Sequence, residues 1–122
     1  MSKKILVVDD SATVRQQVGL ALTQAGFEVV EASDGQMGVD VIDSTPDIAA
    51  VICDVNMPRL NGIEMVAQVK SKPKHANLPI VMLTTEGQPA LIRQAKAAGA
   101  KGWIVKPFKA EQLVAAMRKM AA

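Results

Sequence analysis

Acidic side chains stand at the ends of two apolar runs of the chain. Asp54 follows Ala49–Cys53, and the pair Asp9 and Asp10 follows Ile5–Val8. Apolar runs of this length are typical of strands buried in a parallel sheet. The carboxyl ends of such strands meet at one edge, where α/β proteins hold their ligands. The three carboxylates are therefore expected to line one acidic pocket.

Two further polar side chains also follow apolar segments, Thr84 after Ile80–Leu83 and Lys106 after Trp103–Val105. Carboxylates about 4 Å apart repel each other by roughly 1–4 kcal/mol per pair, so the pocket favours a divalent cation. An oxygen-only ligand set favours Mg²⁺. A metal ion and the Lys106 ammonium could stabilise a phosphoryl group in transfer, with Asp54 as the nucleophile and Thr84 as a hydrogen-bond donor.

Each of these residues also has a plainer structural interpretation when taken alone. Asp9 or Asp10 could cap a following helix. Lys106 could be a surface charge before a turn, and Thr84 could be a polar residue at the edge of its strand. Their common position at expected strand ends is what favours the joint functional interpretation.

Strands and helices are expected to alternate along the chain, because apolar runs and apolar helical stripes are separated by caps, glycines and prolines. The expected strands are Lys4–Val8, Glu28–Ala32, Ala49–Cys53, Ile80–Leu83 and Trp103–Val105, and the expected helices run from about Ser11 to Ala25, Gly35 to Ser44, Gly62 to Lys70, Pro89 to Ala98 and Ala110 to Met120. This alternation predicts an α/β fold with a parallel sheet covered on both faces. Five strands suit the flavodoxin-like, three-layer, doubly wound (βα)5 arrangement with strand order 2-1-3-4-5.

Composition indicates one globular domain over residues 1–122, with 49% hydrophobic and 21% charged residues. The net charge is only +2, and the short basic run Lys70–His75 is interpreted as a solvated loop, so nucleic-acid binding is not expected. Cys53 is the only cysteine, which excludes an internal disulfide. No segment is typical of a signal peptide or a membrane span, and we expect a cytoplasmic protein.

Six short motifs carry a resemblance to a known family. They are Val7–Ser11, Asp54–Pro58, Asn61–Gly62, Leu83–Glu86, Gly99–Ala100 and Lys106–Phe108. With them the chain resembles, over essentially its whole length, the receiver domain of two-component response regulators. Within that family it is most similar to the single-domain chemotaxis regulators.

The resemblance implies a role for each residue of the pocket. Asp54 is the expected phosphoacceptor, taking the phosphoryl group from a phosphohistidine on a sensor histidine kinase. Mg²⁺ is expected on Asp10, Asp54 and the backbone carbonyl of Asn56, with Asp9 acting through a water. Lys106 is expected to pair with the phosphoryl oxygens.

The resemblance also implies a conformational switch. Thr84 is expected to move toward the phosphate and Trp103 to turn inward behind it, which remodels the face formed by the fourth helix, the fifth strand and the fifth helix. Trp103 stands where the family more often has Tyr or Phe, and it could instead be only a core or interface aromatic.

Three further expectations come from the family. Asn56 and Glu86 are expected to tune dephosphorylation by orienting water, which gives a short-lived phosphorylated form. The Lys106–Pro107 peptide is expected to be cis.

The resulting hypothesis is a phosphorylation-activated regulator, not an enzyme beyond Mg²⁺-dependent self-phosphorylation and autodephosphorylation. We expect a monomer with no nucleic-acid or membrane partner and no attached output domain. Its expected partners are a sensor kinase, a docking partner such as a flagellar motor switch protein, and a phosphatase. A phosphate sink, or a stand-alone receiver that regulates a non-motility partner, is the alternative.

Two other classes of protein with related chemistry fit the sequence less well. A haloacid-dehalogenase-like phosphatase would need a second aspartate two residues after its nucleophile, where this chain has Asn56. A flavin carrier would need a Ser/Thr/Gly-rich phosphate loop after the first strand, where Asp9 and Asp10 would repel a phosphate. An interaction module that is never phosphorylated is disfavoured by the intact set of acceptor, acid pair and lysine.

Overall fold

The computed structural model describes residues 3–55, 57, 60–84 and 89–121. The described elements are the strands β1 (Lys4–Val8), β2 (Glu28–Ala32), β3 (Ile48–Asp54), β4 (Ile80–Thr84) and β5 (Gly102–Val105), the helices α1 (Ala12–Gln24), α2 (Gly35–Ser44), α3 (Gly62–Lys70), α4 (Pro89–Ala98) and α5 (Ala110–Met120), and the short 3-10 helix η1 (Pro73–His75). The strands form one parallel sheet in the order β2-β1-β3-β4-β5. This confirms the predicted fold class and strand order.

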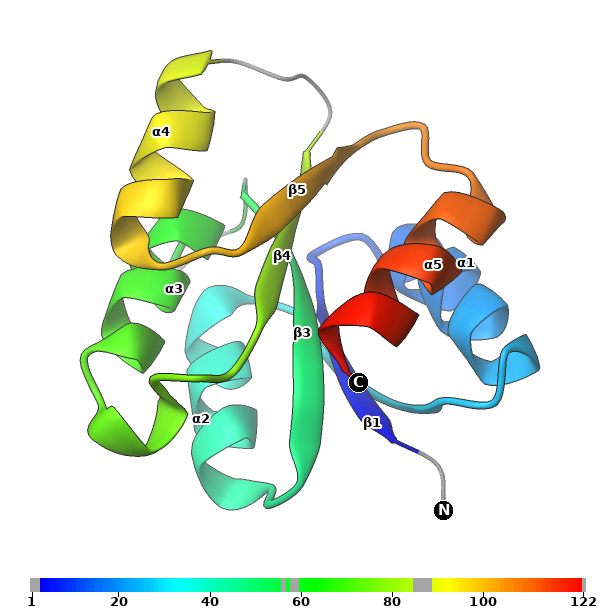
Figure 1. Ribbon diagram of the computed structural model, residues 1–122, viewed down its shortest axis with the longest axis horizontal. Helices are drawn as coiled ribbons and strands as arrows, with labels where there is room; N and C mark the ends of the chain where they lie inside the picture. Colours follow the sequence, from blue (N-terminus) through cyan, green and yellow to red (C-terminus); the bar gives the residue numbers. More distant parts are fainter. Residues whose placement is uncertain (1–2, 56, 58–59, 85–88, 122) are drawn as a thin grey trace.

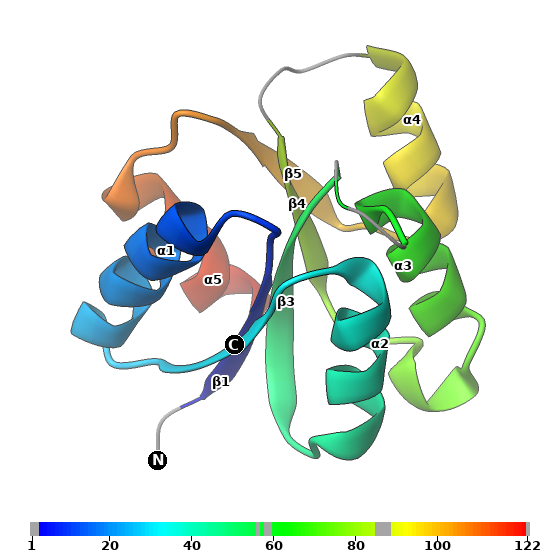
Figure 2. The same ribbon diagram turned by 180° about the vertical axis from the view of Figure 1, so that it is seen from behind.

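Helices cover both faces of the sheet, so the molecule has three layers (Figure 1). Helices α1 and α5 lie on one face, and α2, α3 and α4 lie on the other, as the reverse view also shows (Figure 2). Alternate residues of β1 serve the two layers, because successive side chains of a strand point to opposite faces. Ile5 and Val7 pack in the cluster under α1 and α5, whereas Leu6 and Val8 pack in the cluster under α2, α3 and α4.

Polar side chains begin the three helices that follow β1, β2 and β3. Ser11 Oγ accepts from the Val14 N–H at 3.3 Å, and Asp34 Oδ1 accepts from the Met37 N–H at 2.8 Å. Asn61 and Glu64 form a reciprocal capping box at the start of α3. Each cap satisfies backbone N–H groups that the first turn of a helix leaves without a partner, which fixes where the chain leaves the edge of the sheet.

The strands extend slightly beyond the apolar runs that predicted them. Strand β3 gains Ile48 and Asp54, and β4 gains Thr84. Ile48 is paired with Lys4, and Asp54 with Leu83, so the ladder continues past the end of the apolar pattern. Hydrophobicity reports which residues are buried, but pairing with a neighbour decides the length of a strand.

The basic run Lys70–His75 lies at the surface between α3 and β4, as the sequence predicted, but most of its charged groups have partners within the protein. Lys70 ends α3 and its Nζ donates to the carbonyls of His75 and Ala76 at 3.1 Å each. Lys72 pairs with Asp43 of α2, and His75 Nε2 lies 3.0 Å from Asp43 Oδ1. These partners come from an element about 30 residues earlier in the chain, which the local composition does not reveal.

Within the described residues no helix combines the length and hydropathy that crossing a bilayer requires.

Candidate functional site

Three carboxylates meet at the carboxyl edge of the sheet. Asp9 directly follows β1 and Asp54 ends β3, and these two strands are neighbours in the sheet. One carboxylate oxygen from each of Asp9, Asp10 and Asp54 lies within 4.8 Å of the others. Asp9 is 1% exposed and Asp54 is 6% exposed, whereas Asp10 is exposed to solvent. The acidic pocket predicted from the two apolar runs is present.

Lys106 brings a positive charge into this pocket from the edge of the sheet. It directly follows β5, and its Nζ lies 3.2 Å from Asp9 Oδ2 and 3.6 Å from Asp54 Oδ2. The Lys106 side chain is 16% exposed, so the ion pairs are largely shielded from water. The Lys106–Pro107 peptide is cis, which confirms that expectation.

Each buried carboxylate has one oxygen held by the backbone and one oxygen free to face the lysine. Asp9 Oδ1 accepts from the Ser11 N–H at 2.9 Å, and Asp54 Oδ1 accepts from the Val55 N–H at 2.9 Å. The two Oδ2 atoms therefore point toward the same ammonium group. This orientation leaves Asp54 Oδ2 as the oxygen best placed to react with a group that Lys106 also contacts.

Burial raises the pKa of Asp54 above its ordinary value, and the nearby Asp9 carboxylate raises it further. The Lys106 ammonium and the Val55 N–H lower the pKa of Asp54, and the Asp10 carboxylate adds a smaller upward contribution. Excess negative charge thus persists despite the lysine. A divalent cation would relieve it, and the oxygen-only donor set fits a hard ion such as Mg²⁺.

Several of the predicted site residues are described only in part or not at all. Thr84 ends β4 and is paired with Val105, so its backbone lies at the edge that carries the pocket. The Thr84 side chain and the whole of Asn56 and Glu86 lie outside the described part of the chain. Their expected roles stay predictions.

Trp103 lies in β5, three positions before Lys106, and is half-buried. It packs against the cluster under α2, α3 and α4. The Nζ of Lys96 in α4 lies 4.8 Å from the centroid of the Trp103 ring, which is a cation–π contact. Lys96 was not predicted from the sequence, because a lone lysine on a helix gives no sign of its partner until the packing of α4 beside β5 is known.

Arg15 is a second residue that sequence analysis did not select. It lies in the first turns of α1, and its Nη1 donates to the backbone carbonyl of Asp9 at 2.5 Å. An arginine four residues after a helix cap is common on helix surfaces, so the pattern alone gave no reason to connect it with the pocket.

An open groove of about 730 Å³ borders the pocket on the α1 side. Its mostly apolar wall comes from α1 and from the segment between β5 and α5, including Val14, Leu20, Ala21, Pro107 and Phe108, with Lys106 at one end. Leu20, one of these wall residues, is 59% exposed.

Residues 5–118 match the family described as the response regulator receiver domain. A chemotaxis protein CheY homolog of Campylobacter jejuni is 41% identical over 111 residues, covering 90% of this chain and 85% of the relative. The chemotaxis protein CheY of Thermotoga maritima is 38% identical and covers 99% of both chains. The crystal structure of chemotaxis protein CheY4 of Vibrio cholerae superposes with a TM-score of 0.92 at 39% identity, covering 98% of this chain and 99% of that one.

Proposed function

This chain belongs to the response regulator receiver domain family, and we propose that it is a phosphorylation-dependent switch in which Asp54 is the phosphoacceptor. One observation carries the proposal: the buried carboxylate of Asp54 lies beside Asp9 and Asp10, with its Oδ2 3.6 Å from the Lys106 ammonium. A buried carboxylate with a raised pKa and a paired cation is typical of functional sites. The five-stranded scaffold serves to bring these two side chains together.

Mg²⁺ is the cofactor that this donor set fits best. We assign Asp10 and Asp54 as its carboxylate ligands, the Asn56 carbonyl as a further ligand, and Asp9 as a partner through water. A bound Mg²⁺ would neutralise charge on the phosphoryl oxygens during transfer. The exposure of Asp10 gives the ion a route into the pocket.

In the proposed reaction Asp54 Oδ2 attacks the phosphorus of a phosphohistidine on the donor kinase. The new P–O bond forms as the P–N bond breaks, and the bonding electron pair leaves with the imidazole nitrogen. Lys106 then pairs with a phosphoryl oxygen in place of a carboxylate oxygen, and the Thr84 hydroxyl donates to another. Hydrolysis of the acyl phosphate, with water oriented by Asn56 and Glu86, returns Asp54 to its free form.

The output of the switch is proposed to be the face formed by α4, β5 and α5. Trp103 and Val105 both lie on β5, and Val105 is 41% exposed. Movement of Trp103 behind the Thr84 hydroxyl would change the shape of this face without any change of fold. Two relatives that this chain matches over 85% and 99% of their length are named chemotaxis protein CheY or a CheY homolog. We therefore propose a chemotaxis role, with a CheA-like kinase as the phosphoryl donor and a motor switch protein as the docking partner.

Acetyl phosphate with Mg²⁺ tests the assignment of the acceptor. The wild type should gain one phosphoryl group by intact-mass spectrometry, and Asp54→Asn should gain none. Asp40→Asn, which changes an exposed aspartate of α2, is the matched control and should label like the wild type. Labelling of Asp54→Asn at the wild-type level would show that the acceptor is another residue.

A further inference from the structure

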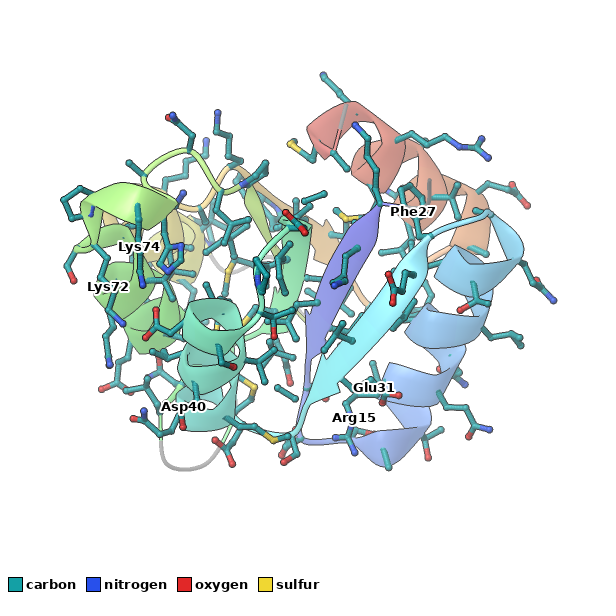
Figure 3. All side chains as sticks on the ribbon, turned by 90° about the horizontal axis from the view of Figure 1, so that it is seen from below. Arg15, Phe27, Glu31, Asp40, Lys72 and Lys74 are labelled. Atoms are coloured by element: carbon teal, nitrogen blue, oxygen red, sulfur yellow. The ribbon has the colours of Figure 1, made fainter. Side chains whose placement is uncertain are left out.

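Arg15 of helix α1 forms hydrogen bonds both to the Asp9–Asp10 segment and to the edge strand β2. Its Nη1 donates to the Asp9 carbonyl at 2.5 Å, and its Nε donates to Glu31 Oε1 of β2 at 3.1 Å. Figure 3 shows the Arg15 and Glu31 side chains side by side, one from α1 and one from β2. The Arg15 side chain is 18% exposed, whereas Glu31 is 53% exposed. Arg15 is thus the less exposed member of the pair.

The carbonyl that Arg15 holds belongs to the peptide that joins Asp9 to Asp10. A peptide unit is planar, so holding its oxygen also constrains the positions of the two flanking Cα atoms, from which the Asp9 and Asp10 side chains extend. The Asp9 N–H is held as well, since it donates to the Ala32 carbonyl of β2 at 3.1 Å. The backbone on both sides of Asp9 is therefore fixed, while the Asp10 side chain depends on the peptide that Arg15 holds.

A guanidinium suits this task better than an ammonium. Its planar group presents several N–H donors at fixed angles, so Nε on Glu31 sets the direction in which Nη1 points. Glu31 also offsets the charge of Arg15. The contribution of Arg15 to the pocket is therefore geometric more than electrostatic.

We infer that Arg15 is a positioning residue of the pocket, which holds the Asp9–Asp10 peptide so that the two carboxylates are oriented for a divalent cation. The inference deepens the proposed function and rests on it, because it assigns how the metal ligands are kept in place. It concerns a residue that touches neither the expected ion nor the phosphoryl group.

A role of Arg15 through its charge and a role through its position predict opposite effects of its removal on the affinity for Mg²⁺. If Arg15 acts as a charge near the pocket, its removal makes the pocket more negative and Mg²⁺ binds more tightly. If Arg15 acts by position, its removal frees the Asp9–Asp10 peptide to change its orientation, and Mg²⁺ binds more weakly. Partners that orient metal ligands typically contribute 10–100-fold in metal affinity, and we expect about tenfold because Arg15 acts through the backbone.

The test is Mg²⁺ titration of the unphosphorylated protein by calorimetry, on the wild type, Arg15→Gln, Arg15→Lys and the surface control Arg118→Gln. Arg118 lies on α5 and is exposed. We expect Arg15→Gln and Arg15→Lys both to bind Mg²⁺ about tenfold more weakly, because lysine keeps the charge but lacks the fixed pair of donors. The control should bind Mg²⁺ like the wild type.

Stability is measured separately, as melting temperatures in EDTA, so that only folded protein enters the comparison. Should Arg15→Gln fail to fold, Arg15→Lys carries the same prediction. A second readout is the rate of labelling by acetyl phosphate, which should recover toward the wild-type value at saturating Mg²⁺, since a positioning defect is overcome by mass action.

Unchanged or tighter Mg²⁺ binding in folded Arg15→Gln overturns the inference, and so does wild-type affinity in Arg15→Lys. Either result leaves the proposed function standing when the wild type binds Mg²⁺ and is labelled on Asp54. A wild type that binds no Mg²⁺ overturns the proposed function and this inference together.

Discussion

Asp9 and Asp54 are two buried carboxylates that share one ammonium. Backbone N–H groups hold one oxygen of each, at 2.9 Å in both cases, and Lys106 faces the other two. One lysine does not balance two buried carboxylates and the nearby Asp10. The site therefore holds unfavourable negative charge, which a bound divalent cation would reduce.

This imbalance predicts a pH-dependent stability effect. The pKa of Asp54 is raised in the folded state, so folding is favoured when Asp54 is protonated and disfavoured once the pH rises through its folded pKa. In EDTA at pH 7, Asp54→Asn should therefore melt a few degrees above the wild type. The difference between the two melting temperatures should become smaller as the pH falls toward 3.8, the ordinary pKa of an aspartate. The measurement is a series of melting curves against pH.

Asp40→Asn serves as the control here too, because Asp40 is exposed. Its melting temperature should not differ comparably from that of the wild type at any pH. A melting temperature of Asp54→Asn below that of the wild type at pH 7 in EDTA would contradict the account of unfavourable negative charge.

Helix α3 begins against the end of β3 at the point where Asp54 leaves the sheet. Gly62, the first residue of α3, donates its N–H to the Val55 carbonyl at 2.8 Å. A Cβ at this position would lie 2.0 Å from the Asp54 carbonyl oxygen and 2.9 Å from Met82 Cε. Glycine is required here because the backbone of α3 approaches the end of β3 so closely.

Gly62→Ala should therefore destabilise the protein by about 3 kcal/mol, at the upper end of the cost of overpacking, because the clash is with backbone and not with a flexible side chain. Denaturant unfolding measures this free energy. The variant should also be labelled more slowly by acetyl phosphate, since the Asp54 backbone must shift.

Gly19→Ala is the matched control within α1. Its added Cβ would meet only Val29 Cγ1 at 3.6 Å, an ordinary contact. That substitution should stabilise the protein by up to about 1 kcal/mol through helix propensity. Equal effects of the two substitutions would mean that the close approach of α3 to β3 has no special cost.

Across the whole molecule, β5 links the pocket to the outer face. Lys106 follows β5 at the pocket, and Trp103 lies within β5 beside α4. Lys96 over the Trp103 ring stabilises the ring in its present position, and an exposed cation–π contact contributes about 0.5–1 kcal/mol. A ring that moves inward on phosphorylation must lose this contact.

Lys96→Met should therefore favour the switched form about two- to fivefold, which is the population change that such a contact energy produces. Trp103 is the only tryptophan, so its fluorescence reports the change directly. The acetyl phosphate concentration that gives half of the fluorescence change should fall by the same factor. Lys101→Met, which changes an exposed lysine in the loop between α4 and β5, should leave that concentration unchanged.

A fluorescence response of Lys96→Met identical to that of Lys101→Met would mean that Lys96 does not restrain the switch. No fluorescence change in a wild type labelled on Asp54 would remove Trp103 from the switch altogether.

Local patterns in the sequence determined much of this protein. Apolar runs, caps and glycines predicted the five strands and five helices, and the alternation of these elements predicted the parallel sheet. The strand order came from the flavodoxin-like arrangement that five such strands suit, and not from any local pattern. Because parallel strands all end at one edge, Asp9, Asp54 and Lys106 could be placed together before any coordinates. These predictions succeeded since they depend on burial and on chain direction, which neighbouring residues encode.

Only the tertiary structure decided which side chains from separate elements touch. Three sets of contacts join elements whose mutual distance no local pattern reports: Lys96 over Trp103, Arg15 with Asp9 and Glu31, and Asp43 with Lys72 and His75. The partners of the basic run Lys70–His75, which lie on α2 and within the following turn, were not predicted for the same reason. Hydrophobic periodicity tells which face of an element is buried, but the packing of one element on another sets which polar groups meet.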